Sequence, residues 1–380
     1  MFTHPLFVLA VLCASVVASE YLTRHTFLRH LGTALVVILV VAVLANLGLI
    51  PSASRGSVVY DGVFTYLAPL SIFYLLLDVN LASIRRAGAQ LLGLFVLGSF
   101  GTAAGVLLGM QLIDGQTHFG EFYPAISGMF TGTYTGGSVN YHAIAIHYDV
   151  MREGVLYAGM TAVDNIITAL WMIVTLAVPL FFRRGRRMEA SPPTGAEAVE
   201  RDTEAISVRG LGLLLGVGFA ALALSDLLTS GLEGLGIAVP SILVLTTIAL
   251  LLAQLPYFHR LAGGQVIGLF CVYLFLAVIG AFCELAALGQ LGELVWRLLV
   301  LVTVTVLVHG VLVFGVAHFA KLDMDVAAVA SQANVGGSSS ALALAKSLDR
   351  MDLYLPGILV GALGNGLGTY LGFAVAGLVG

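Results

Sequence analysis

The chain has 380 residues, of which 38 are charged (17 Lys and Arg, 21 Asp and Glu), so the charged fraction is 10% and the formal net charge is −4. A soluble protein has roughly 25% charged residues and needs them for its surface, whereas 59% of the residues here are hydrophobic. This composition excludes a soluble enzyme, a nucleic-acid-binding protein and a disordered chain. It predicts an all-α polytopic membrane protein.

Twelve apolar segments follow one another along the chain, most of them close to the roughly 20 residues that a membrane helix needs. The first six cover residues 4–20, 32–50, 61–78, 89–113, 122–148 and 153–182. A polar, arginine-rich stretch at 183–210 has the composition of a surface linker. The last six segments cover residues 211–229, 238–256, 264–285, 295–319, 325–347 and 354–379. The chain therefore divides into two halves, residues 1–182 and residues 211–380.

The fifth and eleventh segments differ from the rest because they are polar and rich in glycine. They contain MFTGTYTGGSVNYHAIAIHYDVM and VASQANVGGSSSALALAKSLDRM. A shift of 200 residues aligns them without a gap, and residues 136–165 match residues 336–365 at nine of 30 positions. The matches include both Gly-Gly-Ser strings and the pair Asn165 and Asn365. This agreement predicts an internal duplication.

The basic residues indicate how the two halves are oriented, because cytoplasmic loops carry an excess of Lys and Arg. If all twelve segments cross the membrane, the 17 basic residues divide eight to nine. If segments five and eleven are re-entrant hairpins, fourteen lie on the linker side and three, Arg55, Arg152 and Arg297, on the other. The second assignment predicts that the linker lies in the cytoplasm and both chain termini lie outside the cell. Each half then has five spans and one hairpin. An odd number of spans inverts the second repeat. A crossing broken helix, combined with another segment that does not cross, would preserve the inversion.

The glycine pairs at 136–137 and 336–337 predict breaks in the helices. A helix that restarts after a break presents free N–H groups and a partial positive charge, and two such ends would hold an anion such as a carboxylate. We therefore expect the solute at Thr133, Tyr134, Gly136, Gly137, Ser138, Asn140, Asn334, Gly336, Gly337, Ser338 and Ser339. The alternative is that these glycines only allow helices to pack closely.

Asp164 lies well inside an apolar segment, where a carboxylate is costly unless it is protonated, paired or bound to a cation. Hydroxyl and amide groups can complete a site for Na⁺. We expect the coupling ion, H⁺ or Na⁺, at Asp164, Asn165, Asn365, Thr135 and Gln332. Beyond Na⁺, no metal and no cofactor is expected.

Four further features have simpler interpretations. Asp78 and Glu284 lie near segment ends and are expected at the membrane interface. His309 is alone on an apolar segment and is expected to make a hydrogen bond between helices. The string GALGNGLG at 361–368 mimics a dinucleotide-binding motif, but no strand precedes it, so we expect packing glycines.

The sequence resembles the family catalogued as "domain of unknown function 819", integral membrane proteins found mostly in bacteria. The resemblance extends over nearly the whole chain and is carried by TGTYTGGSVNYHAIA at 131–145 and ASQANVGGSSSALALA at 330–345. The motif GGS-V-N fits Gly136, Gly137, Ser138, Val139 and Asn140, and the motif A-N-x-GG fits Ala333, Asn334, Gly336 and Gly337. His142 and the serines at 338–340 depart from the family pattern.

More remotely, the sequence is similar to the superfamily of cation/proton antiporters, bile-acid symporters, and glutamate and citrate carriers. This similarity implies inverted repeats, a scaffold domain, often the dimer interface, and a mobile core that moves as an elevator. Residues 1–80 and 211–285 would form the scaffold. Residues 89–182 and 295–380 would form the core, with hairpins at 122–148 and 325–347.

These features predict a secondary active transporter without enzymatic activity. It would move a small organic anion or an amino-acid-like solute, coupled to Na⁺ or H⁺, across the plasma (inner) membrane. We expect a homodimer embedded in the lipid bilayer and no nucleic-acid partner. The first alternative is a cation/proton antiporter that uses Asp164 and carries no organic solute. A second alternative, of another class, is a channel or a non-transporting receptor.

Overall fold

The computed structural model of the chain describes residues 3–28, 32–52, 57–77, 79, 86–182, 206–237, 239–258, 262–283 and 291–380, and all regular secondary structure within these ranges is helical. Residues 183–205 of the predicted linker lie outside the described residues, as do Asp78 and Glu284. The same holds for several basic residues used to assign the sides of the membrane, among them Arg29, Arg85 and Arg260.

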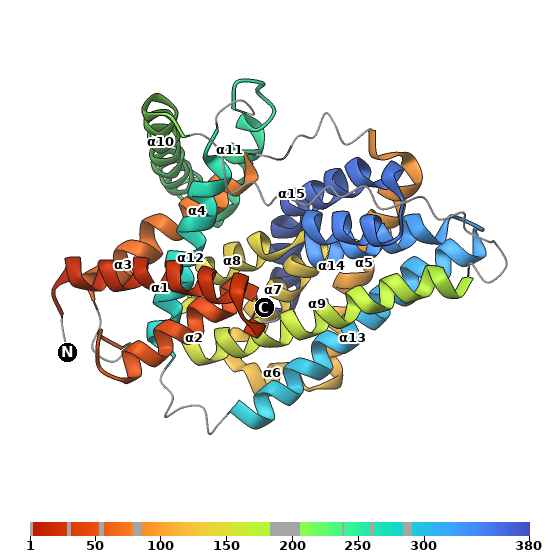
Figure 1. Cartoon of the computed structure of the whole chain (residues 1–380), viewed down its shortest axis with the longest axis horizontal. Coiled ribbons are helices and arrows are strands. Elements are labelled where there is room, and N and C mark those ends of the chain that lie inside the picture. The colour runs from red at the N-terminus through yellow and green to blue at the C-terminus, as the bar shows by residue number, and fades with distance from the viewer. Residues whose placement is uncertain are drawn as a thin grey trace.

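The helices of the first half follow the predicted segments closely (Figure 1). The third segment is one continuous rod in which a π-helical stretch, Val63–Leu67, joins α3 to α4. The bounds are α1 (Pro5–His25), α2 (Gly32–Asn46), α3 (Val58–Gly62), α4 (Ala68–Leu76), α5 (Ala89–Leu112), α6 (Gly115–Phe119), α7 (Tyr123–Gly136), α8 (Ser138–His147) and α9 (Gly154–Phe182).

The second half repeats this order without a counterpart of the short helix α6 among the described residues. Its eleventh segment is one long helix with a non-helical residue, Gly337, in its middle. The bounds are α10 (Val208–Glu233), α11 (Ser241–Leu252), α12 (Gly264–Phe282), α13 (Leu291–Phe319), α14 (Met324–Ser347) and α15 (Tyr354–Val379).

Eight helical rods are long and apolar enough to cross a membrane: α1, α3 with α4, α5, α9, α10, α12, α13 and α15. Two shorter apolar helices, α2 and α11, complete the ten segments that were predicted to span. Over the described part of the chain, neither α7 with α8 nor α14 is among these candidates. The chain is therefore a multi-pass membrane protein.

The fifth segment reverses direction at Gly137, whose φ of 114° and ψ of 175° suit only glycine. An ideal Cβ built on Gly132 would lie 3.1 Å from Asn140 Cβ and 3.1 Å from Ile144 Cδ1, so α8 returns along α7. The two helices form a hairpin, which we call hairpin 1 (residues 123–147).

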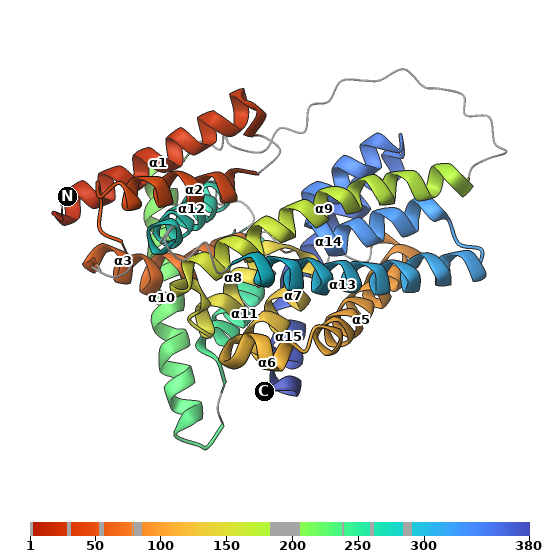
Figure 2. The same cartoon turned by 90° about the horizontal axis from the view of Figure 1, so that it is seen from below.

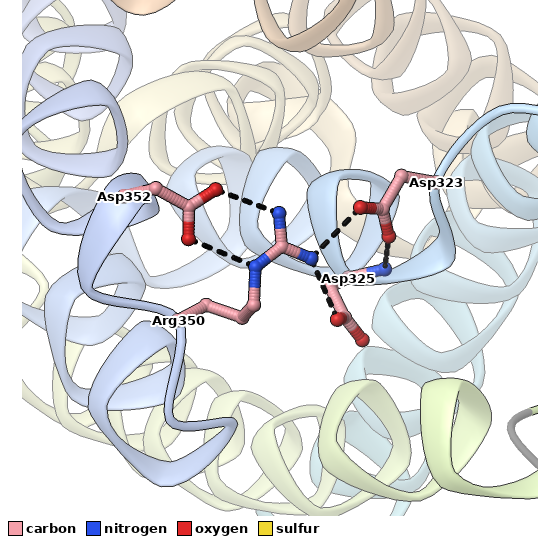
Figure 3. Close-up of polar contacts among 4 residues, drawn as sticks. All are labelled: Asp323, Asp325, Arg350 and Asp352. Atoms are coloured by element: carbon pink, nitrogen blue, oxygen red, sulfur yellow. Dashed lines mark hydrogen bonds and ion pairs between the residues drawn. The ribbon is translucent and has the colours of Figure 1, made fainter. Parts of the chain in front are cut away.

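The eleventh segment reverses in the same way at Gly337, where φ is 74° and ψ is −167°. Arg350, just beyond the end of α14, contacts Asp323 and Asp325 at its beginning, with N–O distances of 2.7 Å and 2.8 Å (Figure 3). A straight helix over this segment would hold its ends about 35 Å apart. Residues 324–347 therefore form hairpin 2, and the alternative of a straight broken helix is excluded for this segment.

The helices form two groups that lie on opposite sides of Figures 1 and 2. The left group contains α1, α2, α10, α11 and α12, and the right group contains α5, α13, α14 and the far end of α9, with α7 and α8 between them. In the right group α5 packs on α13, α14 packs on α15 and on α9, and α7 packs on α15. Three clusters of buried apolar side chains hold these contacts together.

The contact between α7 and α15 depends on glycine. A Cβ on any of three α7 glycines, Gly128, Gly132 or Gly136, would approach the backbone of an α15 glycine: Gly372, Gly368 and Gly364 in turn. Small residues spaced four apart let two helices pack closely. In lipid such packing matters because the hydrophobic effect does not drive helices together. The packing interpretation of GALGNGLG is thus confirmed, and Gly136 has the packing role that was the alternative for the glycine pairs.

Candidate functional site

The tips of the two hairpins touch each other near the middle of the molecule. An ideal Cβ on Gly137 would lie 3.9 Å from Gly337 Cα, and one on Gly337 would lie 3.3 Å from the carbonyl oxygen of Gly136. Asn365 of α15 also lies at this contact: an ideal Cβ on Gly137 would lie 3.4 Å from its Oδ1. The two Gly-Gly-Ser tips therefore meet.

A cavity of about 530 Å³ lies beside the two tips. One wall comes from α1, α2 and α12, and the other from α7, α8, α9 and the tip of α14. Its polar side chains are Glu20, Thr23, Arg24, Thr33, Thr133, Ser138, Tyr141, His142, Thr161, Asp164, Asn165, Thr168 and Tyr273. The cavity reaches the end of α1, where Arg24 Nη2 lies 2.9 Å from Glu20 Oε1 and both side chains are partly exposed.

Six of the sixteen predicted site residues line this cavity: Thr133, Gly137, Ser138, Asp164, Asn165 and Gly336. They come from four helices and from both halves of the chain. The structure therefore brings together four residues of the set predicted for the solute and two of the set predicted for the coupling ion. Their functions remain predictions.

The other ten predicted residues lie behind or beside the cavity wall: Tyr134, Thr135, Gly136, Asn140, Gln332, Asn334, Gly337, Ser338, Ser339 and Asn365. Asn140 is fully buried and fastens hairpin 1 to α15, since its Nδ2 donates to Gly364 O at 3.1 Å and its Oδ1 accepts from Thr369 Oγ1 at 2.8 Å. Ser339 is exposed, and Ser338 packs against Gly361 of α15.

Thr135, Gln332 and Asn334 tie the tips to the surrounding helices. The Thr135 hydroxyl donates to Thr131 O at 2.7 Å, and its carbonyl accepts from Asn334 Nδ2 at 3.0 Å. Thr175 of α9 donates to Gln332 Oε1 at 3.1 Å. These three residues are thus held by protein. A role in ion binding remains a prediction for Thr135 and Gln332, and a role in solute binding remains one for Asn334.

Asp164 is the charged group of the inner cavity. The residue is half-buried, and its Oδ1 is buried with no hydrogen-bond partner. The hydroxyl groups of Tyr134 and Tyr141 interact electrostatically with the carboxyl group, although the two hydroxyls and Asp164 Oδ1 form no hydrogen bond of ordinary geometry. Both tyrosines are almost fully buried. The carboxylate therefore has one oxygen in a tyrosine-lined recess, while the residue as a whole lines the open cavity.

Five buried polar atoms of the hairpins and α9 have no protein partner: Tyr134 Oη, Tyr141 Oη, Asp164 Oδ1, Gln332 Nε2 and Asn334 Oδ1. Leaving such a group unpaired costs about 1–3 kcal/mol. Buried polar groups in stable proteins are nearly always bonded to protein, water, an ion or a ligand. These atoms gather beside the tips, where water, an ion or a ligand would have to complete their hydrogen bonds.

His309 links four helices at the back of the tips. Its Nδ1 lies 2.9 Å from Gly98 O of α5, and its Nε2 lies 2.9 Å from Ser331 Oγ of hairpin 2. Trp171 of α9 donates from Nε1 to the same Ser331 Oγ at 2.9 Å. One assignment satisfies every group: Trp171 donates to Ser331, Ser331 donates to His309, and neutral His309 donates to Gly98. The predicted helix–helix role of His309 is confirmed.

Several lining residues were not predicted as site residues. Thr161 and Thr168 lie three residues before and four residues after Asp164, so they share its helical face, and this spacing could have identified them. His142 is held by a hydrogen bond of 2.5 Å between its Nδ1 and the Tyr157 hydroxyl. No sequence pattern identified Glu20 and Arg24 as site residues, because only the tertiary fold brings α1 to the hairpin tips. Within the described ranges, no three His, Cys, Asp or Glu side chains gather as a metal site.

Two comparisons with known proteins agree with this architecture. The sequence profile of the family described as "Protein of unknown function (DUF819)" matches residues 7–380. A relative from Bacillus subtilis (strain 168), described as uncharacterized membrane protein YjcL, is 28% identical over 350 residues, which cover 87% of this chain and 85% of the relative.

Proposed function

This chain belongs to the DUF819 family of proteins of unknown function, and from that premise and the geometry of the cavity we propose that it is a secondary active transporter. The observation that carries the proposal is the meeting of two hairpin tips beside a polar cavity that contains a half-buried carboxylate. Non-helical backbone at membrane depth is tolerated where it is buried in protein or lines a water-filled cavity. Broken helices that meet at the midplane are a common way to build a solute site in transporters.

An inverted duplication is supported by pairs of residues 200 positions apart. Gly137 and Gly337 both reverse the chain, and Asp149 and Asp349 both end a hairpin in the left-handed conformation, with φ of 54° and 56°. Helix contacts also occur in pairs: α7 packs on α15 as α14 packs on α9. With five spans before the linker, the second copy enters the membrane in the opposite orientation.

An elevator movement is supported by the composition of the cavity walls. The wall from α1, α2 and α12 belongs to the predicted scaffold, residues 1–80 and 211–285. The wall from α7, α8, α9 and α14 belongs to the predicted core, residues 89–182 and 295–380. If the core moves as one body against the scaffold, both hairpin tips and Asp164 move together. The solute would then be carried with its site. A homodimer through the scaffold is part of this proposal.

The coupling ion in this proposal is H⁺ or Na⁺ and binds at Asp164, next to Asn165. The buried, unpaired Oδ1 of Asp164 favours a bound cation or proton, because an uncompensated carboxylate is costly in a spanning helix. The same observation is compatible with a cation/proton antiporter without an organic solute, which is the second candidate.

We place the opening of the cavity near the end of α1, where the lining side chains of Glu20 and Arg24 are partly exposed. The positive-inside rule places this end on the same side as the linker, the cytoplasm. The proposed state is therefore open to the inside of the cell, in the cell membrane.

The test is solute uptake into proteoliposomes that contain the purified chain, driven by an imposed Na⁺ or pH gradient. We expect uptake of a carboxylate or an amino acid that is lost in Asp164→Asn. Glu233→Gln is the matched control because it also turns a carboxylate into an amide, but at an exposed position at the end of α10. This control should keep full activity.

The outcomes separate the candidates. Na⁺-driven or proton-driven solute uptake supports the transporter. Cation/proton exchange without any solute uptake supports the antiporter instead. A folded protein that moves neither solute nor cation against a gradient would overturn the proposal, and ion conductance without coupling would indicate a channel.

A further inference from the structure

The tyrosine-lined recess at Asp164 contains three buried oxygen atoms without partners. Asp164 Oδ1 and the hydroxyl oxygens of Tyr134 and Tyr141 are all buried, and none of them forms a hydrogen bond. Both hydroxyls nevertheless lie close enough to interact with the carboxyl group. A tyrosine hydroxyl beside a carboxylate ordinarily donates a hydrogen bond to it. Because neither hydroxyl does so here, the three oxygens need a partner that the protein itself does not supply.

Two threonines belong to the same group of oxygens. Thr161 and Thr168 lie three residues before and four residues after Asp164 in α9, so the three side chains share one face of that helix. The Tyr141 hydroxyl interacts with Thr161, and the Tyr134 hydroxyl interacts with Thr168. A tyrosine and a threonine therefore lie on each side of the carboxyl group.

These oxygens are suited to accept rather than to donate. The Thr161 hydroxyl donates its proton to Tyr157 O at 2.8 Å, which leaves only its lone pairs for the recess. Hard metal cations are bound by oxygen ligands of this kind. The group offers such a cation one carboxylate and four hydroxyl oxygens.

The charge of the recess favours a monovalent ion. Asp164 is the one charged side chain of the group, and the two other charged residues that line the adjoining cavity, Glu20 and Arg24, pair with each other. One positive charge therefore neutralises the recess, whereas a divalent ion would leave an excess charge in surroundings of low dielectric. A proton binds a single oxygen and cannot serve all three unpaired atoms as a metal cation can.

Resting on the proposed transport function, we infer that the coupling ion is Na⁺ and that its ligands are the Asp164 carboxylate and the hydroxyl oxygens of Tyr134, Tyr141, Thr161 and Thr168. The number of oxygens suits Na⁺, since the larger K⁺ takes more of them. Asp164 and both threonines also line the cavity, so the ion enters the recess from there. Every ligand lies between residues 89 and 182, in the part of the chain proposed to move, so the ion travels with the site.

The test is the effect of Na⁺ on the thermal unfolding of the purified full-length chain in detergent, without any solute. NaCl is titrated against KCl and against choline chloride, at constant ionic strength and neutral pH. We expect the melting temperature to rise with Na⁺ and not with K⁺, because an ion that binds only the folded state stabilises it. Asp164→Asn should lose this response.

Tyr134→Phe and Tyr141→Phe separate ion binding from packing, because each removes one oxygen and keeps the aromatic ring. We expect the Na⁺ concentration for half of the stabilisation to rise at least about tenfold in each variant, since each loses a contact with a charged group. In choline chloride both variants should melt at the wild-type temperature or above it, because each has lost a buried hydroxyl that had no partner.

Tyr74→Phe is the matched control. Tyr74 is also fully buried, but its hydroxyl donates to Leu214 O at 3.1 Å. This variant should melt at a lower temperature in both salts and keep the wild-type affinity for Na⁺. The two recess variants and the control are thus expected to differ in the sign of their effect without Na⁺.

Failure of the inference and failure of the proposed function are distinguishable. Wild-type Na⁺ affinity in both recess variants, or equal stabilisation of the wild-type chain by Na⁺ and K⁺, would overturn the assigned site. Stabilisation by low pH but not by Na⁺, together with proton-driven uptake of a solute, would overturn the choice of ion and leave the transporter standing. A folded chain that responds to neither ion and moves neither solute nor cation would overturn both.

Discussion

At the scale of the residue, Gly137 and Gly337 are the two positions on which the site depends. Both combine a positive φ with an extended ψ, a region of backbone conformation that is essentially restricted to glycine. Each reversal places the end of one helix and the start of the next at the same point. A Cβ added at Gly337 would also lie 3.3 Å from the carbonyl oxygen of Gly136, slightly closer than an ordinary contact, whereas one added at Gly137 would meet only ordinary contacts.

Gly337→Ala tests this role. We expect the variant to lose about 1–3 kcal/mol of stability from backbone strain and to lose transport. Gly212→Ala is the control, because Gly212 lies in α10 with ordinary helical geometry and nothing within 4 Å of an added Cβ. The control should be stabilised by about 0.5–1 kcal/mol. Thermal unfolding in detergent measures both effects, and equal behaviour of the two variants would contradict the assignment.

The effect of replacing His309 on stability can also be predicted. His309→Ala removes the group that joins Ser331 to the carbonyl of Gly98 and leaves both buried. Unpaired buried groups cost about 1–3 kcal/mol each, so we expect a clear decrease in melting temperature. His4→Ala, at an exposed position before α1, should have no measurable effect. An unchanged melting temperature in His309→Ala would show that the network does not hold hairpin 2.

At the scale of the element, hairpin 2 is closed at its base by charge, whereas hairpin 1 is closed more loosely. Arg350 contacts three carboxylates, those of Asp323, Asp325 and Asp352 (Figure 3). The hydrogen bonds that the Arg350 guanidinium donates to Asp352 first, and then to Asp323 and Asp325, raise its pKa above the usual value, so its charge is constant at any accessible pH. Near the base of hairpin 1, Arg152 lies 3.5 Å from both Asp61 and Asp149, in more exposed pairs.

Arg350→Ala should therefore loosen hairpin 2. Asp325 is only 5% exposed and would be left as a buried charge without this partner. Removing one partner from a buried pair destabilises strongly, and with the partial exposure of Arg350 we expect about 1–3 kcal/mol. Hydrogen exchange over residues 324–347 should become faster. Arg152→Ala should have a smaller effect, because surface pairs contribute little.

A second substitution separates charge from packing in this cluster. Adding Asp325→Asn to Arg350→Ala removes the buried charge, so we expect partial recovery of stability and of protection from hydrogen exchange. If the double variant is less stable than Arg350→Ala, the carboxylate of Asp325 is not the source of the destabilisation.

At the scale of the whole molecule, the two groups of helices and the position of the cavity mouth determine the side from which the site is reached. The hairpins enter from opposite sides in the proposed topology, so their tips meet in the middle while their bases are far apart. The cavity is lined both by residues at these tips and by residues at the end of α1. In the proposed topology, Asp164 is therefore reached from the cytoplasm.

Single cysteines test the topology. In a background in which Cys13, Cys271 and Cys283 are replaced, Lys321→Cys should react with a membrane-impermeant thiol reagent only from the cytoplasmic side. Glu233→Cys should react only from the outside. Labelling of both from the same side would contradict the inverted arrangement of the halves.

Thr161→Cys tests the direction of the cavity in the same background. Thr161 lines the cavity, so we expect labelling from the cytoplasmic side and protection by the bound solute or coupling ion. Ile166→Cys is the control, because Ile166 is exposed on another face of the same helix, where lipid excludes the reagent. Labelling of Thr161→Cys from the outside alone would reverse the assigned state.

The helix breaks and the importance of Asp164 could be predicted from the sequence because each has a local cause. A Gly-Gly pair weakens a helix wherever it occurs, and a carboxylate inside an apolar run requires compensation whatever surrounds it. Partners contributed by distant segments could not be predicted. Asn140 was expected to bind solute, yet the fold uses its amide to join hairpin 1 to α15. Glu20 and Arg24 of α1 line the cavity, although nothing in their own segment distinguishes them.

The sequence by itself determined that this protein is a multi-pass membrane protein, that its helices follow twelve apolar segments, and that the fifth and eleventh of these break at Gly137 and Gly337. These properties follow from hydrophobicity and backbone conformation, which act locally. Only the tertiary structure decided that each broken segment folds back, that the two tips touch, and which side chains face the cavity. Those outcomes depend on contacts between residues far apart in the chain, such as Arg350 with Asp323 and Gly136 with Gly364, and local pattern does not encode such contacts.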